Sequence, residues 1–191
     1  EYTPVLILVY GGTYTVHEDT PVGTLQTASI LDSAIVSLYP NANPMVVVQV
    51  AGTSGETHKV VYGNIGLGQI VVRKVYDRNG NGVSDPSEPG VLGWRMELSG
   101  TDVTGVVVGP IVQTTDEEGY TTFTNLRPGT YMVTEVLPIG NWVTRGSTSV
   151  EVIIESSLVG STVIGTFEMV TFTNFCLGTT DFDTQAYSHN K

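Results

Sequence analysis

Residues 68–94 read GQIVVRKVYDRNGNGVSDPSEPGVLGW, an apolar run followed by a stretch rich in Asp, Asn, Gly and Pro. In the apolar run Ile70, Val72 and Lys74 occur at every second position, so they share one face of an extended strand. The polar stretch has the composition of a loop. This change from strand to loop indicates a β-sheet protein built from short strands.

The same pattern continues toward the C-terminus. Apolar runs alternate with Gly, Pro, Asn and Asp, and they predict strands at 68–76, 93–100, 106–115, 120–126, 129–137, 148–155 and 166–177. Short strands with turn signals between them are typical of a β-sandwich. We therefore predict a sandwich domain over 68–178 and a C-terminal tail at 179–191.

The N-terminal part is also predicted to be β. Candidate strands lie at 3–10, 13–18, 44–51 and 57–63. Residues 25–40 combine helical spacing with many Thr, Ser, Ile and Val residues, and we expect two strands there, broken at Asp32 and Ser33. The Gly-rich stretch 63–68 predicts a linker at 65–67. The expected fold is all-β, with two β-sandwich domains (Ig-like or prealbumin-like) in tandem at 1–64 and 68–178.

The charge of the chain excludes some functions. The chain contains eight Lys and Arg residues and has a net charge of −11. Nucleic-acid binding requires clustered basic residues, so we expect no nucleic-acid partner. The single cysteine, Cys176, can form no intrachain disulfide, and we expect it to be a buried apolar residue. Pairing of Cys176 with another chain is the alternative.

We expect an extracellular, cell-surface location. The sequence begins at Glu1 without Met or a signal-peptide pattern, which is typical of a processed product. The apolar run at 5–10 is too short to span a bilayer, so we expect no membrane span.

The loop after the first strand of the second domain predicts a calcium site. Residues 77–88 fit the pattern D-x-[DN]-x-[DN]-G-x5-E, in which alternate positions turn oxygen atoms inward. A plain Asn-Gly hairpin is the alternative interpretation. The predicted Ca²⁺ ligands are Asp77, Asn79, Asn81, the carbonyl of Val83, Asp85 and Glu88.

The stretches 68–94, 114–142 and 170–178 resemble Cna-B-type (SpaA-like, prealbumin-like) domains and the calcium-binding B repeats of Gram-positive surface adhesins. The resemblance covers somewhat more than half of the chain, and none is found for 1–64. It implies a structural module of prokaryotic surface proteins.

Many members of this family form an isopeptide bond between a Lys of the first strand and an Asn of the last strand, assisted by an acid on a middle strand. The resemblance places these roles on Lys74, Asn174 and Glu135. Each shares a face with apolar residues of its strand, so all three side chains should enter the core. There, burial would favour a neutral Lys74 amine and a protonated Glu135. The alternative is that Lys74 is an edge residue whose side chain reaches solvent, with Glu135 as its salt-bridge partner and Asn174 satisfying a turn.

Motifs of common enzyme classes are missing, and His17, His58 and His189 are isolated in the sequence. We therefore expect no enzyme beyond autocatalytic formation of the isopeptide bond. The expected function is a structural subunit of a filament or pilus, with copies of itself as partners in a homopolymer, and with other surface proteins as further candidates. Residues 3–10 are a candidate donor strand for a neighbouring subunit, or a central strand of their own domain. The alternative function is a cell-surface adhesin or stalk module that binds a host or matrix ligand.

Overall fold

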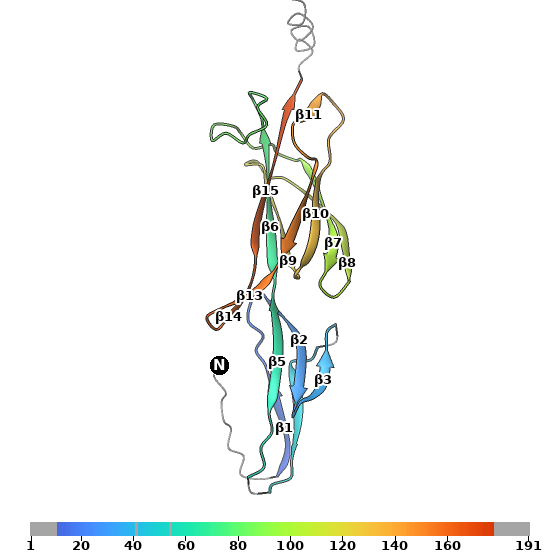
Figure 1. Ribbon diagram of the computed structural model, residues 1–191, viewed down its shortest axis with the longest axis vertical. Coiled ribbons are helices and arrows are strands. Elements are labelled where there is room, and N and C mark those ends of the chain that lie inside the picture. Colours follow the sequence, from blue (N-terminus) through green and yellow to red (C-terminus); the bar gives the residue numbers. More distant parts are fainter. Residues whose placement is uncertain (1–10, 41, 54, 178–191) are drawn as a thin grey trace, which may run out of the picture. The chain divides into compact units, whose positions relative to one another are not determined.

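Figure 1 shows the computed structural model, which describes residues 11–40, 42–53 and 55–177. The described residues form strands and turns and include no helix, which confirms the all-β prediction. Accordingly, they contain no helix that could cross a membrane. The chain divides into two compact units. Unit 1 comprises the described part of Glu1–Leu67 together with Glu155–Thr166, and unit 2 comprises Gly68–Ile154 and the described part of Phe167–Lys191.

Unit 1 contains two small antiparallel sheets and a separate hairpin. The sheets have the strand orders β1-β4 and β3-β2-β5. Their strands are β1 (Gly12–His17), β2 (Thr24–Leu31), β3 (Ala34–Leu38), β4 (Met45–Val50) and β5 (Val60–Gly66). Alternation along β4 buries Val46 and Val48 and exposes Met45 and Val47, as expected for a sheet with one buried face. The predicted break at Asp32 and Ser33 is confirmed.

The hairpin of unit 1 comes from a distant part of the sequence. Its strands are β13 (Ser156–Val159) and β14 (Thr162–Gly165). The backbone N–H of Gly66 donates to Ser156 Oγ at 2.8 Å, and a Cβ on Gly66 would lie 2.2 Å from the carbonyl carbon of Ile164. The sequence analysis placed 155–166 inside the second domain. The hairpin instead packs on β5, because its contacts are with residues about ninety positions upstream.

The expected linker at 65–67 is largely strand. Strand β5 pairs with β2 as far as Gly66, and Leu67 alone separates β5 from β6 (Gly68–Tyr76). Gly66 has no room for a side chain, and a Cβ on Gly63 would lie 3.2 Å from Thr27 Oγ1. Gly63 and Gly66 therefore permit close packing within unit 1.

Unit 2 contains two four-stranded sheets with a hydrophobic core. The strand orders are β12-β10-β7-β8 and β11-β15-β6-β9. Besides β6, the strands are β7 (Arg95–Asp102), β8 (Val107–Thr114), β9 (Tyr120–Leu126), β10 (Gly129–Glu135), β11 (Trp142–Thr144), β12 (Ser149–Ile154) and β15 (Phe167–Cys176). The core includes Ile70, Val72 and Phe172 from one sheet and Leu98 and Val133 from the other. The strands predicted for this part of the chain are confirmed, whereas the short β11 was not predicted.

The first and last strands of unit 2 are neighbours. Strand β6 lies between β15 and β9, and β15 runs parallel to β6 with Phe172 opposite Lys74 and Asn174 opposite Tyr76. Adjacent parallel strands require a long connection, and here the rest of unit 2 and the β13–β14 hairpin supply it. This arrangement brings the residues around 74 and 174 together.

Candidate functional site

Lys74, Glu135 and Asn174 meet inside unit 2. Lys74 lies on β6, Asn174 on the adjacent β15, and Glu135 at the end of β10 in the other sheet. Lys74 and Asn174 are 0% exposed and Glu135 is 3% exposed. Because β6 is a central strand, Lys74 is not an edge residue that reaches solvent. That part of the alternative interpretation is wrong.

The amine of Lys74 contacts both partners. Lys74 Nζ donates to Glu135 Oε2 at 2.7 Å and also to Asn174 Oδ1. The backbone fixes these positions, because the side chains come from strands paired in regular ladders. The Lys74–Glu135 contact is a fully buried ion pair.

Burial disfavours the charged form of the Lys74 amine. Lys74 Nζ also lies 4.2 Å from the centroid of the Trp94 ring, a contact that by itself favours the charged amine, and Trp94 packs edge-on against Trp142. Burial lowers the pKa of Lys74 from 10.5 to about 8, and the contacts with Glu135 oppose this change only in part. Near neutral pH, a larger fraction of the Lys74 amine is therefore in the neutral, nucleophilic form than in an exposed lysine.

Two polar atoms of the cluster lack a hydrogen-bond partner within the described part of the chain. These are Glu135 Oε1 and the amide nitrogen of Asn174, and both are buried. Unsatisfied buried polar groups cost free energy. The cluster thus presents an amine, a carboxamide with an unbound nitrogen and a carboxyl group, which are the groups required for amide exchange.

The loop at 77–88 starts directly after β6. Asp77 is 0% exposed and Glu88 is 5% exposed. The backbone N–H of Asp77 donates to the carbonyl oxygen of Asn174 at 2.9 Å, so the loop is joined to the strand that carries the crosslink candidate. Gly80 and Gly82 adopt the left-handed backbone conformation, with φ of 67° and 79°.

The predicted ligand side chains of this loop are hydrogen-bonded to one another and to the loop backbone. Asp77 accepts from the N–H groups of Asn81 and Gly82 at 3.1 and 2.7 Å. Asp85 Oδ2 accepts from the side-chain amides of Asn79 and Asn81 at 2.8 and 3.0 Å. Glu88 closes the loop by accepting from the N–H groups at 78 and 85. The structure therefore brings these side chains together.

The donor set of this loop fits a hard cation such as Ca²⁺ in its chemistry, because every candidate ligand is an oxygen atom. The described residues contain no group of three or more His, Cys, Asp or Glu side chains placed to hold a metal. Asp77, Asp85 and Glu88 would consequently need the amide oxygens of Asn79 and Asn81 and the Val83 carbonyl to complete a site.

Several neighbours of these sites were not predicted from the sequence. Trp94 contacts the Lys74 amine and Trp142 packs against Trp94, yet nothing in the local pattern distinguishes them from ordinary core aromatics. The expectation that Cys176 is buried is wrong, because this residue at the end of β15 is exposed. The candidate donor strand at 3–10 and the tail at 179–191 lie outside the described residues.

Comparisons with known proteins agree with the sequence resemblance. Residues 66–183 match the family model described as SdrD B-like domain, which confirms the resemblance to surface-adhesin B repeats. No curated protein matches the chain.

Solved structures with some likeness include pilins. The minor pilin GBS52 of Streptococcus agalactiae is 18% identical, with 71% of this chain and 60% of that one covered and a TM-score of 0.41. The pilus 2b backbone protein of group B streptococcus is 17% identical, with coverages of 89% and 53% and a TM-score of 0.42. The major pilin SpaD of Corynebacterium diphtheriae is 11% identical, with coverages of 87% and 56% and a TM-score of 0.42. The matches thus span little more than half of those chains, and they carry no argument about function.

Proposed function

The chain belongs to the SdrD B-like domain family, and from this premise we propose that it is a structural subunit of an extracellular filament or pilus at a cell surface. The buried contact of Lys74 with Glu135 and Asn174 carries the proposal. It joins the first and last strands of unit 2, which is where a subunit under tension needs reinforcement.

The chemistry of this cluster is an intramolecular amide exchange. The neutral Lys74 amine attacks the side-chain carbonyl carbon of Asn174, and a new C–N bond forms. The bond to the Asn174 amide nitrogen breaks, and that nitrogen leaves as ammonia. Proton transfer from Lys74 to Glu135 along their hydrogen bond would convert the buried ion pair into the neutral amine and a protonated carboxyl group. Glu135 then donates a hydrogen bond to the carbonyl oxygen, gives its proton to the leaving nitrogen and takes up the proton that the Lys74 nitrogen loses. The exchange also removes the buried, unsatisfied amide group of Asn174.

The product would be a covalent staple. Lys74 and Asn174 are 100 residues apart in the sequence. If an amide crosslink restricts the unfolded chain as a disulfide does, a loop of this length gives about 4–5 kcal/mol of stabilisation. Such a staple would supply a covalent restraint that the one cysteine cannot, because it has no partner for an intrachain disulfide.

The proposed cofactor is a structural Ca²⁺ ion in the loop at 77–88. The residues that would hold it are Asp77, Asn79, Asn81, the carbonyl of Val83, Asp85 and Glu88. The ion would neutralise buried carboxylates, which burial otherwise disfavours. The Asp77–Asn174 backbone contact supports a joint role, because a rigid loop would help to fix β15 beside β6.

We propose homopolymer assembly through residues 3–10 as a donor strand. These residues are apolar on both faces, and in the described part of unit 1 the β1-β4 sheet has two strands, each with an open edge. The two units would serve as β-sandwich domains in tandem, with the β13–β14 hairpin completing the first.

Intact mass spectrometry tests the crosslink. The purified chain should weigh less than its sequence mass by one ammonia. Lys74→Arg, Asn174→Ala and Glu135→Gln should each restore the full sequence mass of the variant. Lys59→Arg, which changes an exposed lysine of unit 1, should keep the loss. A wild-type chain at full sequence mass would refute the crosslink.

Electron microscopy of native material tests the filament. We expect filaments that contain this chain, and we expect deletion of residues 1–12 to prevent their assembly. If the native protein forms no filament, and the truncated chain retains binding to a host or matrix ligand, the adhesin or stalk function is correct instead.

A further inference from the structure

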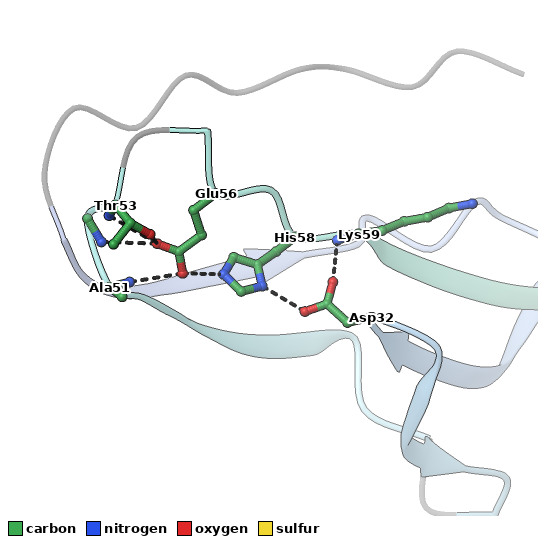
Figure 2. A network of polar contacts seen from close by, with 7 residues as sticks. Asp32, Ala51, Thr53, Glu56, His58 and Lys59 are labelled. Atoms are coloured by element: carbon green, nitrogen blue, oxygen red, sulfur yellow. Dashed lines mark hydrogen bonds and ion pairs between the residues drawn. The ribbon is translucent and has the colours of Figure 1, made fainter.

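Figure 2 shows a polar network around His58 in unit 1. It lies outside the two candidate sites described in unit 2. His58 Nδ1 lies 2.7 Å from Asp32 Oδ2, and His58 Nε2 lies 3.0 Å from Glu56 Oε1. Asp32 is in the turn between β2 and β3, whereas Glu56 and His58 belong to the connection between β4 and β5. One imidazole ring therefore bridges carboxylates from two separate connections.

The backbone holds each carboxylate in place. Glu56 Oε1 accepts from the N–H of Ala51 at 3.0 Å, and Glu56 Oε2 accepts from the N–H of Gly52 at 3.1 Å. Asp32 Oδ1 accepts from the N–H of Lys59 at 2.7 Å. Because both anions are anchored independently of His58, the ring fits between two fixed acceptors.

The protonation state of His58 decides whether both contacts are favourable. An ionised carboxylate only accepts hydrogen bonds, and a neutral imidazole has one N–H group. A neutral His58 would direct a lone pair at one of the two anions, whereas the imidazolium donates to both. Asp32 and Glu56 are the charged groups that act on His58, and the Lys59 side chain points away from them (Figure 2).

We propose that His58 is a pH-controlled latch, which joins the β2–β3 turn to the β4–β5 connection when protonated and releases one of its two contacts when it loses the proton. The latch lies beside the first residue pairs of the β2-β5 ladder, where Leu31 is opposite Val60 and Ile30 is opposite Val61. Release would loosen this end of the sheet.

The pKa changes agree with this geometry and fix the pH window. The hydrogen bonds to Asp32 and Glu56 raise the pKa of His58 above 6.5. The stabilisation from His58 is thus complete below pH 6.5 and is lost as the pH rises through the higher folded value. The hydrogen bond from Ala51, followed by that from His58, lowers the pKa of Glu56 from 4.5 to about 2, so its contribution is complete above pH 4.5. The latch is fully closed between these limits and opens on the alkaline side.

An NMR titration of the histidine rings in the full chain tests the latch directly. We expect the His58 ring to titrate above the ordinary histidine pKa of 6.5. Asp32→Asn and Glu56→Gln should each lower the pKa of His58, because each removes one of the two anions that contact the ring. Lys59→Arg, which keeps the backbone N–H group and the positive charge, is the control and should leave the pKa of His58 unchanged. A His58 that titrates at or below the ordinary value, or that ignores both acidic substitutions, would overturn the proposal.

Amide hydrogen exchange provides a second readout that a purely structural role for the histidine would not give. The control variant is His58→Gln, which is uncharged at every pH. Within the closed window, the N–H groups of Ala51, Gly52 and Lys59 should exchange roughly two- to fivefold more slowly in the wild type than in this variant, the range expected for exposed ion pairs. This difference in exchange rate between the wild type and His58→Gln should vanish at pH values above the pKa of His58. A ratio that stays constant across the titration would contradict the latch.

Discussion

At the scale of single residues, the environment of Lys74 bears on the proposed crosslink. Its amine is buried, lies against the Trp94 ring and has Glu135 as its charged partner. Burial outweighs this partner and lowers the pKa of Lys74 to about 8. Burial therefore favours the neutral form of the Lys74 amine, which is the form that the proposed crosslink requires.

In the uncrosslinked variant Asn174→Ala, the lowered pKa of Lys74 should make the free energy of unfolding depend on pH. Its Lys74 remains an amine with a pKa below the unfolded value, so between pH 8 and 10.5 the unfolded chain binds more protons than the folded chain. The free energy of unfolding should rise over this range, by at most about 3.5 kcal/mol at about 1.4 kcal/mol per pKa unit. Urea unfolding followed by Trp fluorescence measures the change.

The matched control is the wild-type chain. If its Lys74 nitrogen is part of an amide, it cannot titrate, and the rise between pH 8 and 10.5 should be missing. A wild type and a variant with the same pH dependence would show that Lys74 is a free amine in both.

At the scale of elements, the loop at 77–88 continues from β6 and is held in one conformation by its own hydrogen bonds. Its buried carboxylates are satisfied by loop N–H groups, so the loop has a defined conformation from its own hydrogen bonds. Asp77 also binds the backbone of β15 through its N–H group. A cation bound here would stabilise a loop that already has a defined conformation. Its expected effect is to raise the stability of unit 2.

Thermal unfolding with and without calcium tests this element. Saturating Ca²⁺ should raise the Tm and a chelator should lower it, because a ligand at one hundred times its Kd stabilises the folded state by about 2.7 kcal/mol. Glu88→Gln should abolish the calcium-dependent increase in Tm. Glu117→Gln, at an exposed hairpin tip, is the control and should leave it unchanged. A Tm of the wild type that does not respond to calcium would exclude the site.

At the scale of the whole molecule, the chain passes between the two units at 67–68, 154–155 and 166–167. Tension applied to the ends of the chain would enter unit 2 through β6 and leave through β15, which are adjacent and parallel. Force on opposite ends of two parallel strands shears the ladder between them. The proposed Lys74–Asn174 bond would lie directly in this path, and it would shield the residues between its ends from extension.

Single-molecule stretching from the two termini measures this shielding. In the wild type, the segment between Lys74 and Asn174 should contribute no extension when unit 2 yields. In Asn174→Ala it should contribute roughly 330 Å, since an extended chain spans about 3.3–3.6 Å per residue. Equal extensions in both proteins would show that the staple is absent. Lys59→Arg serves as the control that retains the wild-type extension.

The sequence by itself determined the class of the fold and the inward faces of its strands. Ile70, Val72 and Lys74 predict a shared face because strand periodicity is a local property, and the spacing at 77–88 is local too. The all-β class and the break at Asp32 and Ser33 followed from such patterns and are confirmed.

Only the tertiary structure decided which distant residues are neighbours. Three features join residues that are far apart in the sequence. Strand β6 pairs in parallel with β15, the β13–β14 hairpin belongs to unit 1, and Gly66 packs closely against Ile164. The bridge made by His58 has the same origin, since Asp32 and His58 are 26 positions apart. Local periodicity shows which way a side chain faces, but its partner depends on how the whole chain packs.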